Sequence, residues 1–237
     1  MTRIDKRPVE TLFLDAGGVL VLPNWTRVSQ ALARYGVQAS PDALGRADAF
    51  ARRELDAPTM TRATNDAQRG WHYFNLVLKH AGIALSDATD AALAELKAYH
   101  EAENLWEQVP ADVPRALARL RASGLQLVVV SNANGKLRFL MERLGLAPAF
   151  DVMLDSHVEG VEKPDPRLFQ IALERSGGRP ETTLHVGDLY HVDVVGARAA
   201  GLRAVLFDAA GLYPEADCPR VRSLTDLAEG LAADRLP

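Results

Sequence analysis

The feature that most constrains the fold is an alternation of short apolar segments with amphipathic ones, which runs from about Asp112 to the end of the chain. The apolar segments are LQLVVV, FDVML, TLHV and AVLF, and TLFL near the start of the chain has the same character. Strands that are apolar throughout are typical of a parallel sheet buried on both faces. The sequence therefore predicts an α/β fold with a doubly wound, Rossmann-like parallel sheet.

The amphipathic segments between the strands carry helix start and stop signals. In DVPRALARLRASG, Asp112 stands at an N-cap position, Val113, Leu117 and Leu120 share one face, and Gly124 ends the pattern. The segments KLRFLMERLG, DPRLFQIALERSGG, HVDVVGARAAG and SLTDLAEGLAADRLP follow the same pattern. Right-handed crossovers through such helices bring every strand-to-helix loop to the carboxyl edge of the sheet, where ligands bind in this class of fold.

The segment between Asn24 and Trp106 differs, because its apolar residues follow a helical period and it contains no convincing strand. Helices are expected at about 26–36, 41–56, 65–82 and 87–104, separated by polar or proline-containing turns. We therefore expect a Rossmann-like core formed by residues 1–22 and 107–237, with an inserted α-helical cap domain at 23–106.

Composition excludes several classes of function. The net charge is −4 and the basic residues are scattered among helical segments, so no nucleic-acid partner is expected. Cys218 is the only cysteine, which excludes an intrachain disulfide and a thiolate metal site. No apolar run approaches the length of a membrane span. We expect a cytoplasmic protein without a membrane partner, either a monomer or a homodimer.

Four loops that follow predicted strands carry polar residues able to do chemistry. They hold Asp15, Ser131, Lys163, and the pair Asp188 and Asp193. Each residue alone has an ordinary structural interpretation as a turn, a cap or a surface position. Their shared position at one sheet edge favours a common site.

The four loops, in this order, resemble the motifs of the haloacid dehalogenase-like (HAD) hydrolase superfamily, and the resemblance covers the whole chain. It implies that Asp15 is a nucleophile, that Ser131 holds the transferring group and that Lys163 neutralises it. It also implies substrate contacts and a Mg²⁺ site. The implied substrate-binding residues are Ser131, Asn132, Lys163 and Gly18, and the implied metal ligands are Asp15, Gly17 through its carbonyl, Asp188 and Asp193.

Elementary chemistry agrees with these implied roles. A carboxylate that attacks phosphorus or carbon forms an ester and divides one difficult displacement into two easier steps. Oxygen ligands suit Mg²⁺, and Lys163 supplies a compact positive charge. Without a metal, the carboxylates of Asp15, Asp188 and Asp193 outweigh Lys163, so a phosphate dianion would meet a negative site. A phosphorylated substrate therefore predicts a requirement for Mg²⁺.

Gly17 departs from the pattern of the phosphatases in this superfamily, which usually carry a second Asp two residues after the nucleophile. That residue protonates the leaving group, a role worth roughly 10²- to 10⁴-fold. Three hypotheses follow: a Mg²⁺-dependent phosphatase of a small phosphorylated metabolite, a metal-independent 2-haloacid dehalogenase, or a catalytically weak or inactive binding protein with this fold. The Gly187-Asp188 pair favours the phosphatase, because the dehalogenase branch does not keep it. A phosphonate-cleaving relative uses a cap lysine, and the only cap lysines are Lys79 and Lys97.

Residues of the insertion would set substrate choice by closing over the carboxyl edge. The candidates are Arg62, Arg69, Trp71, His72 and Tyr73. An aromatic run on a helix is more typical of core packing, so these residues stay unassigned. Tyr190 and His191 in the fourth loop have a simpler interpretation as solvent-facing positions.

Overall fold

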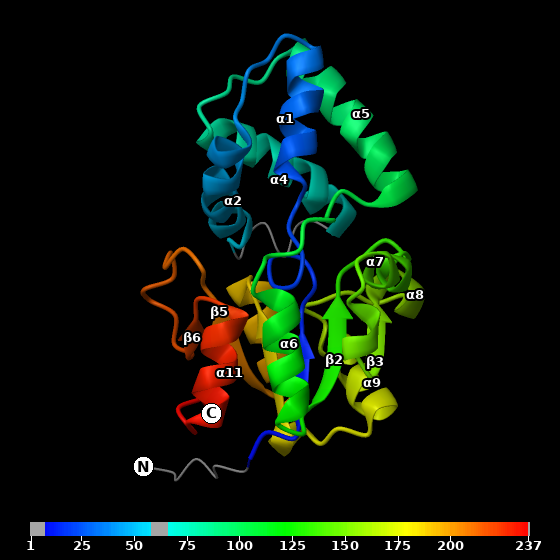
Figure 1. Cartoon of the computed structure of the whole chain (residues 1–237), viewed down its shortest axis with the longest axis vertical. Coiled ribbons are helices and arrows are strands. Elements are labelled where there is room, and N and C mark those ends of the chain that lie inside the picture. Colours follow the sequence, from blue (N-terminus) through cyan, green and yellow to red (C-terminus); the bar gives the residue numbers. More distant parts are fainter. Residues whose placement is uncertain (1–7, 58–65, 237) are drawn as a thin grey trace. The chain divides into compact units, whose positions relative to one another are not determined.

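The structure is a computed structural model that describes residues 8–57 and 66–236. The chain divides into two compact units, one built from residues up to Leu20 and from Val109 onward, the other from Val21–Gln108 (Figure 1). The boundaries expected from the sequence were 1–22 and 107–237 for the core and 23–106 for the insertion. Each unit has its own buried apolar cluster.

The larger unit is built on a six-stranded sheet with the order β3-β2-β1-β4-β5-β6, in which every neighbouring pair is parallel. Its strands are β1 (Thr11–Leu14), β2 (Gln126–Ser131), β3 (Val152–Asp155), β4 (Thr183–Gly187), β5 (Arg203–Phe207) and β6 (Arg220–Val221). The predicted doubly wound parallel sheet is confirmed. The strand that ends before Asp15 lies between those that end at Ser131 and Gly187.

Helices cover both faces of the sheet (Figure 1). They are α6 (Val113–Ala122), α7 (Leu137–Arg143), α8 (Ser156–Glu159), α9 (Pro166–Ser176), α10 (Val195–Ala199) and α11 (Leu224–Ala232). Helices α6 and α11 pack against each other, and α9 packs against α10. The cluster beneath α9 and α10 contains Phe13, Val128 and Phe169, all fully buried. Alternate strand residues therefore face two separate helical layers.

Two helix starts differ from ordinary capped helices. Asp112 occupies the N-cap position of α6, as predicted, but its side chain makes no capping hydrogen bond there. The expected continuous helix at 191–201 is divided into a π-helical turn, η3 (Tyr190–Val194), and the short α10. The amide of Val195 donates to the carbonyl of Tyr190, five residues earlier, so the first turn is wider than an α-helical turn. This widening matters for the site described below.

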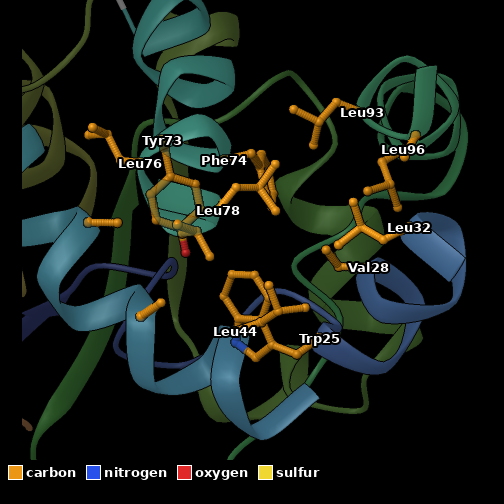
Figure 2. Packing of buried hydrophobic residues seen from close by; sticks show 14 of the residues in the cluster. Trp25, Val28, Leu32, Leu44, Tyr73, Phe74, Leu76, Leu78, Leu93 and Leu96 are labelled. Carbon is orange, nitrogen blue, oxygen red and sulfur yellow. The ribbon is translucent and has the colours of Figure 1, made fainter. Parts of the chain in front are cut away.

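The smaller unit is helical in its described part, with α1 (Trp25–Arg34), α2 (Pro41–Leu55), α4 (Asp66–His80) and α5 (Asp87–Glu103). Asn24, Ser40 and Ser86 cap α1, α2 and α5 with their side chains, which satisfies amides that helix starts leave without partners. Figure 2 shows the apolar cluster that these helices enclose. The residues of this cluster that the figure labels are Trp25, Val28, Leu32, Leu44, Tyr73, Phe74, Leu76, Leu78, Leu93 and Leu96.

The two ends of the helical unit are joined to each other. Leu22 and Gln108 form an antiparallel bridge with main-chain hydrogen bonds of 2.8 and 3.0 Å. Beside it, the carboxylate of Glu107 accepts hydrogen bonds from Asn24 (2.9 Å), Arg27 (3.0 Å) and the hydroxyl of Tyr99 (2.9 Å). The guanidinium of Arg27 lies 3.8 Å from the centre of the Tyr99 ring, a cation–π arrangement. This polar cluster connects the start of α1 to the end of the insertion.

Candidate active site

The first site residue, Asp15, directly follows β1 at the carboxyl edge of the sheet. Its amide donates to the carbonyl of Val186 in β4 at 2.9 Å, which extends the β1–β4 ladder by one residue. Gly18 then adopts a φ of +81°, in the left-handed region that glycine occupies without strain. The chain turns sharply after the strand, and the Asp15 carboxylate stays at the sheet edge with only 9% of the residue exposed.

Lys163 joins two carboxylates in the interior. Its ammonium lies 2.9 Å from Oδ1 of Asp15 and 2.7 Å from Oδ1 of Asp193, and the residue is 1% exposed. A buried ammonium requires such partners, because desolvation of an unpaired charge is far more costly than any packing gain. The structure thus brings residues from three predicted loops into direct contact.

Asp193 is held by donors from three directions. Besides Lys163, Nε2 of His185 lies 3.0 Å from its Oδ1, and the amide of Leu189 donates to its Oδ2 at 3.0 Å. The wide turn of η3 carries this carboxylate, which is fully buried. Gly187 lies against it so closely that an added Cβ would be 2.1 Å from Cγ of Asp193. Glycine in the Gly187-Asp188 pair is therefore required by the packing of Asp193.

The charges of this buried group shift one another's pKa values in opposite directions. Burial by itself would lower the pKa of Lys163, but the charges of Asp15 and Asp193 outweigh burial and raise it. Burial opposes ionisation of Asp193, yet the Lys163 charge and the His185 hydrogen bond hold the pKa of Asp193 well below its usual range. Burial raises the pKa of Asp15 and the charge of Asp193 raises it further, which together outweigh the lowering by Lys163. Asp15 is the carboxylate left without full compensation.

Asp188 completes an acidic cluster. One oxygen each of Asp15, Asp188 and Asp193 lie within 4.8 Å of one another, and all three residues are buried. Three carboxyl groups face one ammonium, so acidic groups outnumber basic ones in this cluster. Carboxylate oxygens are ligands that Mg²⁺ prefers in proteins, so the residues present fit such an ion.

Asn132 connects the second loop to the third. Its side-chain Nδ2 donates to the carbonyl of Lys163 at 3.0 Å, and its Oδ1 accepts the Lys163 amide at 2.8 Å. These two bonds use both ends of the Asn132 amide group on the main chain of Lys163. Ser131 is the last residue of β2, 3% exposed, and its hydroxyl makes a long 3.4 Å contact with the carbonyl of Asn132.

The loop after Ser131 is shaped by residues that sequence reasoning missed. Asp155, in register with Ser131 on the neighbouring strand, accepts the amides of Gly135 (3.1 Å), Leu137 (3.1 Å) and His157 (3.0 Å). The hydroxyl of Ser156 accepts the amide of Ala133 at 3.1 Å. Asp155 thereby caps the start of α7, where Lys136 provides no side-chain cap. An acid at the end of an apolar strand was the available signal.

The remaining candidates have contacts within their own units. Tyr73 is buried in the helical unit and donates its hydroxyl to Asp48, while Trp71 packs against the same apolar cluster. His72 is exposed, and Tyr190 donates to Asp217 at 2.7 Å, with its ring against that of His191. Arg62 and the side chain of Arg69 fall outside the described part of the chain.

Comparison with known proteins gives concordant matches. A family model described as haloacid dehalogenase-like hydrolase matches residues 9–201. The haloacid dehalogenase-like hydrolase domain-containing protein 3 of Homo sapiens is 32% identical over 193 residues, covering 79% of this chain and 74% of the human protein. Glyceraldehyde 3-phosphate phosphatase of Methanopyrus kandleri is 31% identical over 174 residues, covering 68% and 73% respectively. The HAD-hydrolase YfnB from Bacillus subtilis, solved bound to magnesium, shares the fold with a TM-score of 0.68 at 19% identity, over 95% of this chain and 99% of that one.

Proposed function

Because this chain belongs to the haloacid dehalogenase-like hydrolase family, we propose that it is a Mg²⁺-dependent phosphatase of a small phosphorylated metabolite. The observation that carries the proposal is that the buried Lys163 ammonium forms ion pairs with both Asp15 and Asp193, with the Asp188 carboxylate close to both acids. It supplies a nucleophile, a fixed positive charge and an oxygen-rich cation site at one edge of the sheet. Similarity to a protein named as a phosphatase supports the same substrate class.

In the proposed reaction, Asp15 attacks the phosphorus atom. Its Oδ1 is engaged by Lys163, which leaves Oδ2 to form the new bond. The bond from phosphorus to the leaving oxygen breaks, and its electron pair stays on that oxygen. A water molecule then attacks the aspartyl phosphate, which releases inorganic phosphate and restores the Asp15 carboxylate. Lys163 stabilises negative charge on the phosphoryl oxygens in both steps.

The proposed metal ligands are the carboxylates of Asp15 and Asp188 and the carbonyl of Gly17. Mg²⁺ at these groups would offset their negative charge and polarise the phosphoryl group. Asp193, predicted from sequence among the ligands, has its oxygens occupied by Lys163, His185 and the Leu189 amide. We therefore assign Asp193 to support of the site through Lys163.

The proposed phosphoryl contacts are the Ser131 hydroxyl, the Lys163 ammonium and main-chain amides near Gly18 and Asn132. The Asn132 side chain acts through the main chain of Lys163, since both ends of its amide are used there. Gly17 supplies no proton donor. The favoured substrates are accordingly phosphates whose leaving oxygen departs with little protonation, or substrates that provide their own acid.

Gly17 also keeps the dehalogenase hypothesis open, because a halide needs no proton to leave. A nearly inert binding protein is the third hypothesis. Asp188 favours the phosphatase over both, because a buried acid whose oxygen lies within 4.8 Å of those of Asp15 and Asp193 suits a metal-dependent reaction.

We also propose a cytoplasmic location, supported by the single buried cysteine. Among the described residues, no helix combines the length and apolarity needed to cross a bilayer. A monomer and a homodimer are both compatible with the proposal.

The test is a phosphate-release screen over sugar phosphates, phosphoglycolate, nucleotides and aryl phosphates, with and without Mg²⁺, run beside chloride release from 2-chloropropionate. We expect Mg²⁺-dependent phosphate release that Asp15→Asn abolishes. Chloride release without metal would overturn the proposal in favour of the dehalogenase. Release of neither phosphate nor chloride would favour the binding protein.

A further inference from the structure

His185 is an anomaly in an otherwise apolar strand. It lies in the middle of β4, is 0% exposed, and pairs across the sheet with Phe13 on one side and Ala204 on the other. Among the described residues its Nδ1 has no hydrogen-bond partner. Burying a polar atom without a partner is unfavourable, and an apolar side chain would avoid that loss. The histidine therefore requires an explanation other than packing.

Its other ring nitrogen makes the contact that supplies one. Nε2 lies 3.0 Å from Oδ1 of Asp193, an atom that also accepts from Lys163 at 2.7 Å. Because the Asp193 carboxylate only accepts hydrogen bonds, Nε2 carries the proton and donates. Burial lowers the pKa of His185, which keeps the ring neutral.

The ring is itself held in place. Phe169 of α9 meets it edge to face, with ring centres 4.9 Å apart and an angle of 77° between the planes. A ring fixed in this way gives its hydrogen bond one direction. Phe169 thus fixes the His185 ring, His185 orients the Asp193 carboxylate, and Asp193 in turn holds the Lys163 ammonium.

We propose that His185 is a positioning residue of the active site, whose Nε2–H fixes the Asp193 carboxylate and so holds Lys163 against Asp15. The proposal rests on the phosphatase function proposed above. His185 touches no substrate in this arrangement. Without its donation, Oδ1 of Asp193 keeps Lys163 as its only side-chain donor among the described residues, and the ammonium moves away from its shared position between two carboxylates.

A displaced Lys163 affects the transition state more than the bound substrate, because its charge is needed most while phosphoryl transfer takes place. The expected result is therefore a loss in kcat with little change in KM. Misplacement of a supporting group of this kind reduces rates by about 10- to 100-fold. A residue that served packing alone would change the melting temperature without this kinetic split.

The experiment compares His185→Gln with His185→Asn, using p-nitrophenyl phosphate in saturating Mg²⁺. The glutamine amide reaches the position of Nε2 and can donate to Asp193, whereas the shorter asparagine amide corresponds to Nδ1. We expect His185→Asn to lower kcat by about 10- to 100-fold and His185→Gln to recover most of that loss. Leu184→Ala, at a fully buried neighbour in the same strand, is the matched control for lost stability.

Equal kcat values for the two His185 variants, or a loss no greater than that of equally destabilised Leu184→Ala, would overturn the proposal. A second measurement is independent of turnover. Nitrogen-15 NMR of the wild-type imidazole should show the neutral Nε2–H tautomer, with a ring proton that Asp193→Asn makes exchange faster; an Nδ1–H tautomer overturns the proposal. A wild-type protein that releases no phosphate from any substrate refutes the phosphatase instead, and the tautomer still decides whether His185 orients Asp193.

Discussion

The side chain of Asn132 and the main chain of Lys163 are paired by two hydrogen bonds, of 3.0 and 2.8 Å. We predict that Asn132→Ala lowers kcat/KM more than tenfold and destabilises the protein by about 1–3 kcal/mol, because it leaves a buried amide and carbonyl without partners. Steady-state kinetics and urea unfolding measure the two effects. Arg138→Ala, at an exposed position on α7, is the control and should change neither.

Mg²⁺ should stabilise the protein through Asp188. An ion at about 100 times its Kd adds about 2.7 kcal/mol to the free energy of unfolding when it binds only the folded state. We expect Mg²⁺ to raise the melting temperature of the wild type and to leave that of Asp188→Asn unchanged. Asp42→Asn, on an exposed turn of α2, should keep the full Mg²⁺ response. An undiminished response in Asp188→Asn would contradict the assignment.

Gly187→Ala should damage the site without introducing a charge. Its methyl carbon would meet the carboxylate of Asp193 at 2.1–2.4 Å, so Asp193 or the strand must shift. Overpacking of this kind destabilises by roughly 1–3 kcal/mol, and we expect kcat to fall at least tenfold as Asp193 moves from Lys163. Gly45→Ala, where the new carbon would lie 3.4 Å from Trp25, is a matched control that should fold and turn over normally.

Glu107 should make the stability of the helical unit depend on acid pH. Burial opposes its ionisation, but hydrogen bonds from Asn24, Tyr99 and Arg27 outweigh burial and lower its pKa. A lowered folded-state pKa stabilises the protein above the unfolded value near 4.3 and ceases to do so as the pH falls toward the folded value. The free energy of unfolding, measured between pH 7 and pH 3, should therefore change less with pH in Glu107→Gln than in the wild type. At neutral pH this variant should also be less stable by about 1–3 kcal/mol. Parallel pH curves for the two proteins would be the contrary result.

Gly17→Asp should raise phosphatase turnover if the missing general acid limits the rate. The expected gain is bounded by the roughly 10²- to 10⁴-fold contribution of such groups. Gly17→Asn adds a side chain of the same size without an ionisable acid and should give no gain. An unchanged or lower rate for Gly17→Asp would mean that another group, or the substrate, already provides the proton.

The parallel sheet was predictable because every core strand except the shortest lies in a mostly apolar segment, and these segments alternate with amphipathic helices along the chain. The two-residue β6 could not be found, since Arg220 and Val221 form no pattern. The division of 191–201 was equally hidden: the periodicity of HVDVVGARAAG fits an ordinary helix, and only the contacts of Asp193 favour a wider first turn.

The site residues that reside in loops were predictable from position and resemblance, whereas their partners were not. His185 is concealed inside the apolar run TLHV, and Asp155 at the end of another. Asn132 was predicted to bind substrate, but a local sequence cannot show that both ends of its amide are used on Lys163, thirty-one positions away. This long-range pairing depends on how the two loops lie against each other in space, which hydrophobic periodicity along the chain does not show.

The antiparallel bridge between Leu22 and Gln108 has a consequence for how this protein can be re-engineered. Since the chain leaves and returns at hydrogen-bonded partners, a short turn could close the gap, and a substitute segment of any length would begin and end at the same place. The entropy lost on closing such a loop grows only slowly with its length. The bridge is therefore a site at which one insertion can be exchanged for another. A foreign cap could be grafted at these two residues to change substrate choice while the sheet-edge chemistry is retained.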